Sequence, residues 1–343
     1  MDGWRNLLKG DATSWLLERD VDNPGVRYFA LTDLLDRLVN DHEVAGARRA
    51  VMETGPVPVI LAQQHPDGYW VKAGAGYAPK YRGTVWSLIL LAQLGADGGD
   101  PRVRKAGEYP LTHALAPNGG FSVNGSPSAC ILCLGGNLGA ALLDLGFLGD
   151  ERLERALDWL ARAITGQGFA LAEEQGALLR YYRSGTCGPG FACSANNRLP
   201  CAWGAVKAML AFSKMPASAR TPAIKAAIEA GVEFLFSRDP AMADYPAGWS
   251  SKPSRSWFTF GFPVFYVTDV LQNLEAVAGL GFGSDLRLKP AIELLLSKQD
   301  AHGRWKMEYT YNGKTWVDIE TKGQPSKWVT LRALRLLKRI GGC

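Results

Sequence analysis

The chain has 343 residues, of which 47% are hydrophobic and 21% are charged, and its formal net charge is +5. This composition is typical of a globular protein, and the positive charge forms no basic block, so we expect no nucleic-acid partner. No window reaches 18 uninterrupted apolar residues, so we expect no transmembrane segment. The first residues lack the basic start and apolar run of a signal peptide, and we therefore expect a cytoplasmic protein.

Charge-bearing and more apolar helices are expected to alternate along the chain. The charge-bearing segments with helical periodicity are residues 11–19, 42–62, 100–114, 150–165, 217–237 and 285–299. The more apolar helical segments are residues 25–39, 80–94, 127–146, 199–213, 263–280 and 325–340. Several of the apolar segments end at a glycine, as helix C-terminal capping favours. The pattern predicts an all-α protein.

The turns between these helices repeat. Gln64–Trp70 and Gln299–Trp305 share a glutamine followed by Gly-x-Trp, and Gly68, Gly120 and Gly168 lie 52 and 48 residues apart. That spacing is the length of two helices with their connections, which is the signature of a helical repeat protein. We predict one domain over residues 1–343, an (α/α)6 double-ring toroid of inner and outer helices. An open solenoid is the competing architecture, because repeats of this length also build solenoids.

Several motifs carry a family resemblance. Two longer motifs are the turn Gln64-His-Pro-Asp67-Gly68-Tyr-Trp70 and the segment Trp257-Phe-Thr-Phe-Gly-Phe-Pro263. Three shorter ones are Cys133-Leu-Gly-Gly, Arg220-Thr-Pro and Ser326-Lys-Trp328. On these motifs the chain resembles the terpenoid cyclase and protein prenyltransferase toroid superfamily. Within this superfamily it resembles bacterial and archaeal prenyltransferase and squalene oxidase repeat proteins more closely. The resemblance implies the toroid fold and, more weakly, an apolar isoprenoid ligand, because a fold alone does not fix function.

Two features of the superfamily are missing from the sequence. There is no Asp-x-Asp-Asp run, which squalene-type cyclases use to protonate an alkene. Nor is there the Asp, Cys and His zinc set of protein prenyltransferases, since none of the four histidines is close in sequence to the cysteines.

Five of the six cysteines lie between Cys130 and Cys201. Four thiolates can hold a tetrahedral zinc ion, and a glycine-rich loop can fold tightly around one. We predict a zinc site formed by Cys133, Cys187, Cys193 and Cys201, with Cys130 as a substitute ligand. Four ligands would make the zinc structural, whereas three would leave an open position for catalysis. The alternative is that these cysteines pack a helix interface.

Six inner-helix N-termini should meet at one end of the ring, where helix dipoles favour anionic groups. Basic and aromatic residues gather at these N-termini. We expect the substrate-binding residues to be Tyr28, Tyr81, Arg82, Trp86, Trp203, Phe262, Phe265, Lys327 and Trp328. They suit a small apolar or anionic-headed ligand, and the alternative is ordinary core packing.

Asp269 is the candidate catalytic acid. It follows Tyr266 in an apolar segment near the start of an inner helix, a setting that suits a general acid. Tyr266 and Asp33, on the first inner helix, complete the candidate catalytic set, because two carboxylates across a cavity permit acid–base chemistry. The alternative for Asp269 is a structural pair with a lysine or arginine, or a loop cap.

Three functions remain open from the sequence. The leading one is a terpenoid-cyclase-like enzyme that binds an apolar ligand in the central cavity and carries a cysteine-ligated zinc. The second is a metal-assisted or carboxylate-dependent hydrolase of esters, phosphoesters or glycosides. The third is a non-catalytic ligand- or peptide-binding module with structural zinc.

Overall fold

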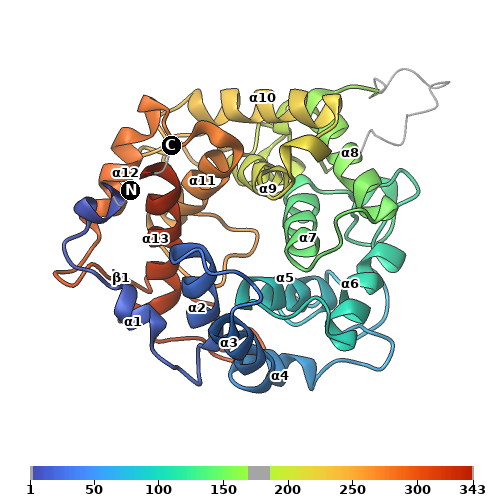
Figure 1. The fold of residues 1–343 in the computed structure, drawn as a ribbon. Coiled ribbons are helices and arrows are strands. Elements are labelled where there is room, and N and C mark those ends of the chain that lie inside the picture. Colours follow the sequence, from blue (N-terminus) through green and yellow to red (C-terminus); the bar gives the residue numbers. More distant parts are fainter. Residues whose placement is uncertain (1–2, 169–185, 342–343) are drawn as a thin grey trace.

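The computed structural model describes residues 3–168 and 186–341, which form two concentric rings of helices (Figure 1). The inner helices are α2 (Pro24–Phe29), α5 (Thr84–Leu94), α7 (Leu132–Asp144), α9 (Ala202–Ser213), α11 (Val270–Val277) and α13 (Lys327–Gly341). The outer helices are α1 (Thr13–Leu17), α3 (His42–Glu53), α4 (Pro56–Leu61), α6 (Pro101–His113), α8 (Glu151–Thr165), α10 (Pro222–Phe236) and α12 (Lys289–Ser297). The predicted (α/α)6 double-ring toroid is confirmed.

The helices are shorter than the sequence pattern predicts, for local reasons. The segment 42–62 divides at Gly55, whose φ of +68° breaks the helix before Pro56. The segment 25–39 ends early in a π-turn, Ala30–Leu34, and the segment 263–280 becomes helical only after Asp269, which caps α11. A small antiparallel pair, β1 (Trp305–Lys306) and β2 (Pro325–Ser326), precedes α13.

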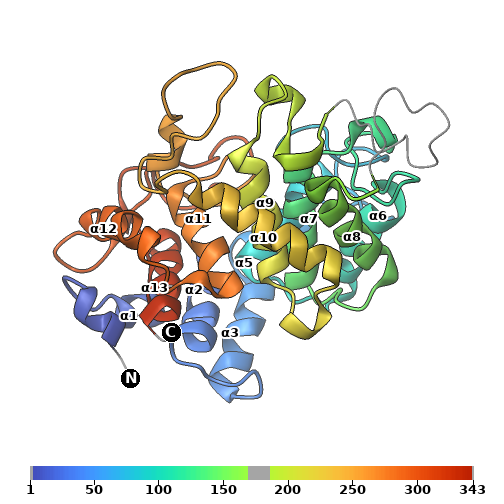
Figure 2. The same ribbon diagram turned by 90° about the horizontal axis from the view of Figure 1, so that it is seen from above.

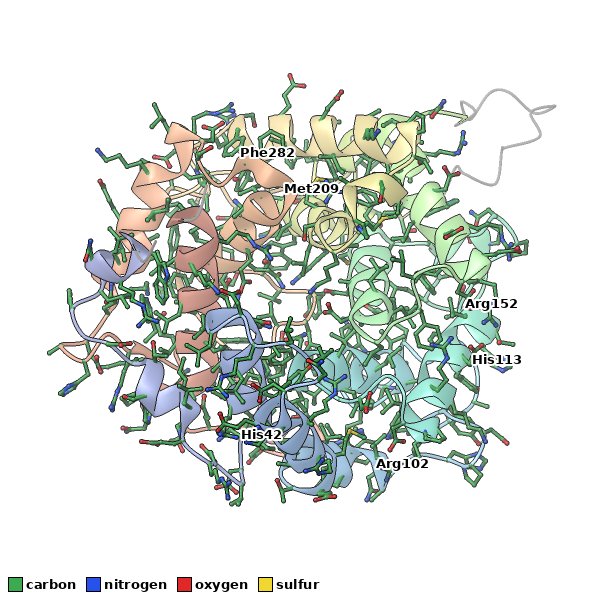
Figure 3. All side chains as sticks on the ribbon, in the orientation of Figure 1. His42, Arg102, His113, Arg152, Met209 and Phe282 are labelled. Atoms are coloured by element: carbon green, nitrogen blue, oxygen red, sulfur yellow. The ribbon has the colours of Figure 1, made fainter. Side chains whose placement is uncertain are left out.

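The inner and outer helices differ in how far their side chains are buried. Every residue of α5 except Gln93 is buried, because this inner helix has neighbours on all sides. The outer helices carry charged and polar side chains on the outside, as Figure 3 shows for Arg102, His113 and Arg152. Where the rings touch, small residues permit close approach: a Cβ at Gly231 of α10 would lie 2.4 Å from the sulfur of Met209 on α9.

The two best matched repeat turns have the same hydrogen bonds. The indole of Trp70 donates to the carbonyl of Ile60 at 2.8 Å, and that of Trp305 donates to the carbonyl of Leu295 at 2.8 Å. The backbone N–H of each tryptophan donates to a threonine hydroxyl in the next inner helix, Thr84 in one case and Thr330 in the other. Each turn therefore ties an outer helix to the inner helix that follows it.

The turn glutamines show that the ring closes. The side chain of Gln64 donates to the carbonyl of Arg102 in the next outer helix, α6. The equivalent Gln299 instead accepts from the backbone of Lys9 and donates to Leu7, just before α1. The start of the chain thus occupies the place of the next repeat, and α13 packs against α2. The structure is a closed ring and not an open solenoid.

The loops before α9 and α11 rise above one end of the ring (Figure 2). This end carries the N-termini of inner helices and most of the predicted site residues. Within residues 3–168 and 186–341, no helix has both the length and the apolar character needed to cross a membrane.

Candidate functional site

An aromatic cluster lies at the end of the ring where the inner helices begin. The ring of Tyr81 stacks on Phe265 at 5.3 Å and contacts Tyr311 at 4.6 Å, and Trp86 meets Phe265 edge-on at 5.5 Å. These side chains come from the loop before α5, from α5 itself, and from the loops that precede α11 and α13. We call Tyr81, Trp86, Phe265, Tyr266 and Tyr311 the aromatic cluster.

The outer side of this cluster is partly exposed. Trp86, Phe265 and Tyr311 are buried, whereas Tyr81 and Tyr266 are half-buried. The half-buried Trp203, at the start of α9, approaches Tyr266 with ring centres 6.3 Å apart. The hydroxyls of Tyr81 and Tyr266 lie 3.4 Å apart. Burial and this hydrogen bond raise the pKa of Tyr81 well above its usual value, so the phenol stays neutral.

The remaining predicted aromatic residues form a separate, buried group. Phe262 stacks on Trp328 at 4.2 Å, and the indole of Trp328 donates to Asn23 at 2.8 Å. Both rings are at least 97% buried. Tyr28 lies beside Phe29 at the edge of this group and stacks under Arg48. These contacts join α2 to α13, so the group closes the ring by packing.

Most cations at the helix N-termini already have partners. Lys327 forms ion pairs with Glu18 at 3.2 Å and Asp20 at 3.1 Å. Arg82 donates to the carbonyl of Thr315 and lies over the ring of Trp316. Paired cations attract a ligand anion less strongly. This arrangement gives little support to the expected anionic ligand head.

Asp269 has a structural environment. Its carboxylate accepts from the N–H of Gln272, which caps α11, and it forms a two-point ion pair with Arg332 at 3.1 Å for each contact. Arg332 also pairs with Glu275, and its side chain is only 7% exposed. Removal of either partner would leave an uncompensated buried charge, so the stability of the fold depends on both. The structure thus places Asp269 in the helix-capping, arginine-paired setting that was the alternative to catalysis.

Asp33 lies in the π-turn after α2, which packs against α13. Its carboxylate pairs with Arg335 of α13 and accepts from the hydroxyl of Thr32. Asp33 and Asp269 therefore do not form one acid–base pair, because each carboxylate forms an ion pair with a different arginine.

Lys207 is a buried cation that the sequence analysis missed. Its ammonium on α9 donates to the side-chain carbonyl of Gln272, which also accepts from Thr268 at 2.7 Å. The residue is completely buried, and this burial lowers its pKa to about 7. The sequence does contain an indication of this buried cation, because Lys207 is the single charged residue within the apolar run Ala205–Ala211.

Three of the four predicted zinc ligands lie near one another. Cys193 and Cys201 share a hydrogen bond that lowers the pKa of Cys193 below its usual value. Burial, with a smaller contribution from the nearby Cys193, raises the pKa of Cys133 to about 11. The thiol of Cys187 instead donates to the carbonyl of Cys130 at 3.2 Å. Among the described residues, no group of three or more Cys, His, Asp or Glu side chains is close enough to hold a metal ion. The zinc site stays a prediction.

The histidines lie away from these cysteines. His42 and His113 are on the outer helices α3 and α6, on the outside of the ring (Figure 3). His65 and His302 belong to the two repeat turns. None of them supplies a nitrogen ligand to the cysteine group.

The described residues line cavities of different sizes. One of about 250 Å³ lies between β1 and the end of α12, and Phe260, Lys298 and Glu308 are among the residues that line it. A cavity of about 40 Å³ beside Cys201 and Trp203, and one of about 20 Å³ beside Asp269 and Tyr311, are much smaller. Sites for organic ligands commonly occupy about 300–1,000 Å³, so a ligand at the aromatic cluster would bind against its exposed side.

The closed ring of paired helices, with aromatic residues at the inner-helix N-termini, defines an (α/α)6 toroid. No protein-family model and no curated protein matches the sequence.

Solved structures of similar shape exist. A protein from Actinoplanes is similar over 98% of this chain and 99% of its own, at 15% identity and a TM-score of 0.47. A variant of the type II terpene cyclase MstE from Scytonema, in complex with geranylgeranyl dihydroxybenzoate, is similar over 94% of this chain and 88% of its own, at 16% identity and a TM-score of 0.45. The toroid fold is defined by the arrangement of the helices themselves.

Proposed function

We propose that this protein is a terpenoid-cyclase-like toroid that binds an apolar ligand of the isoprenoid class against the exposed side of the aromatic cluster. The observation that carries the proposal is the position of Tyr81, Trp203 and Tyr266. These three rings come from different inner-helix starts, are half-buried, and stand in front of fully buried rings. Aromatic surface of this kind stabilises an apolar chain by burial and by ring contacts.

Catalysis is a separate part of the proposal. Tyr266 is the candidate catalytic residue with a hydroxyl at the aromatic surface, whereas Asp269 and Asp33 are held by arginines. This pairing favours the binding module as the second candidate function. It gives no support to a carboxylate-dependent hydrolase, which needs two carboxylates around one water molecule.

The zinc ion is retained as a proposal for the same end of the ring. Zinc would join Cys133 on α7 and Cys201, the residue before α9, to Cys193 in the loop that leads to α9. Cys187 would have to turn away from the carbonyl of Cys130 to become the fourth ligand. Such a zinc would hold the loop rather than take part in chemistry.

A farnesol titration tests the proposed function. We expect the wild-type protein to bind farnesol in equilibrium dialysis, and Trp203→Ala and Tyr81→Ala each to weaken binding about tenfold, the loss of about 1.4 kcal/mol of contact energy. Trp15→Ala, on the outer helix α1, is the matched control and should bind like the wild type. Mass spectrometry of the recovered farnesol distinguishes an enzyme, which changes the ligand, from a binding module, which returns it unchanged.

A further inference from the structure

The ammonium of Lys80 lies over three aromatic rings at the rim of the aromatic cluster. Its nitrogen is 4.3 Å from the ring centre of Tyr266, 5.3 Å from that of Tyr77 and 5.9 Å from that of Trp86. We call Tyr77, Trp86 and Tyr266 the aromatic cage. A cation within about 6 Å of a ring face is attracted by the ring quadrupole, and here three rings act on one cation.

The walls of the cage are held by contacts that do not involve Lys80. The indole of Trp86 donates to the backbone carbonyl of Tyr77 at 2.6 Å, and the rings of Tyr77 and Trp86 are 5.1 Å apart. Tyr266 is held on the other side by its parallel stack with Tyr81 and by Trp203. Removal of the lysine side chain would therefore leave the three rings in place.

No acidic group accompanies the cation. Among the described residues, Lys80 takes part in none of the ion pairs and lies exposed on the loop before α5. An uncharged aromatic cage favours a weakly hydrated organic cation over a metal ion, which needs charged or oxygen ligands.

We propose that the aromatic cage binds the quaternary ammonium head of a ligand, and that Lys80 is a tethered competitor that fills the cage when the ligand is absent. Lys80 is exposed and has a long flexible side chain, so it can leave without disturbing the fold. This inference deepens the proposed function, because it names the head group of a ligand whose apolar part would lie over Tyr81 and Trp203.

The test uses tetramethylammonium, a cation without an apolar tail, followed by its methyl signal in ligand-observed NMR at constant ionic strength. Because a tethered group competes at an effective concentration in the millimolar range, Lys80→Ala should bind the probe about tenfold more tightly than the wild type. Lys72→Ala, an exposed lysine of the same loop, is the matched control and should change nothing. Neutral tert-butanol, of similar size, should bind neither protein.

Two further variants identify the cage walls. In the Lys80→Ala background, Tyr266→Ala should abolish binding of tetramethylammonium, whereas Tyr266→Phe, which keeps the ring, should retain it. Tyr77→Ala replaces Tyr266→Ala if circular dichroism shows that the latter is unfolded. The inference is wrong if Lys80→Ala binds the probe no better than the wild type, or if tert-butanol binds equally well. A negative result here leaves the farnesol titration unaffected, so the two proposals fail separately.

Discussion

At the scale of single residues, the buried charges decide which predicted roles the structure supports. The apolar neighbours of Asp269 indicate a general acid, but its partner Arg332 is 63 residues away in the sequence. Sequence periodicity reports which face of a helix is buried, and it contains no information about which distant side chain meets a given carboxylate. The same limit hid Lys207, whose hydrogen-bond partner Gln272 is on another helix.

Lys207 gives a prediction for pH dependence. Its pKa is about 7 in the folded protein and 10.5 in an unperturbed lysine. Between these two values the unfolded chain binds more protons than the folded chain, so Lys207 makes the free energy of unfolding rise as the pH increases from 7 to 10.5. Lys207→Met removes this contribution and should stabilise the protein at pH 7, by on the order of 3 kcal/mol.

Urea unfolding at pH 7, 8.5 and 10 measures this effect. The stability advantage of Lys207→Met over the wild type should shrink as the pH rises, because the free-energy cost of removing the proton from Lys207 on folding falls as the pH approaches 10.5. All other titrating groups are common to the two proteins and cancel in the difference. A difference that stays constant across this range would contradict the prediction.

The cysteines give a second prediction at this scale. Metal analysis of the purified protein should find one zinc per chain, and Cys133→Ser and Cys201→Ser should each lower that content. A fully folded protein without metal would show that the cysteine spacing reflects packing, as the orientation of Cys187 already suggests for one ligand.

At the scale of helices, close approach between neighbours sets which small residues are required. On α7, a Cβ at Gly136 would lie 2.3 Å from the carbonyl carbon of Lys207 on α9, a backbone atom that cannot move aside cheaply. The adjacent Gly135 has room, because its nearest contact would be a methyl group of Leu160 at 3.4 Å. The helix positions were predictable from hydrophobic periodicity, whereas this contact required the packed structure.

This contrast predicts opposite effects of two neighbouring substitutions. Gly136→Ala should destabilise the protein by about 1–3 kcal/mol, because α7 and α9 would have to separate. Gly135→Ala should be neutral or stabilising by up to about 1 kcal/mol, since alanine favours the helix. Thermal unfolding of both variants measures the effects, and equal changes in the two would contradict the described packing of α7 on α9.

At the scale of the whole molecule, the repeat turns explain how the sequence encodes a closed ring. The shared tryptophan hydrogen bonds of Trp70 and Trp305 follow directly from the motif. Closure follows from Gln299, which binds the backbone beside α1 as Gln64 binds α6. The helical repeat could therefore be predicted from the sequence, whereas closure of the ring is shown by the contacts of Gln299 with the start of the chain. The division of the aromatic residues into the exposed cluster around Tyr266 and the buried pair of Phe262 and Trp328 could not be predicted, because both groups occupy equivalent positions before inner helices.

The farnesol titration of the wild type, Trp203→Ala and Trp15→Ala tests the central claim most directly. The claim is that the partly exposed aromatic residues at one end of the ring form the ligand site. We predict saturable binding of farnesol to the wild type and to Trp15→Ala, and about tenfold weaker binding to Trp203→Ala. Absence of binding to the wild type, or equal affinity in all three proteins, would contradict it.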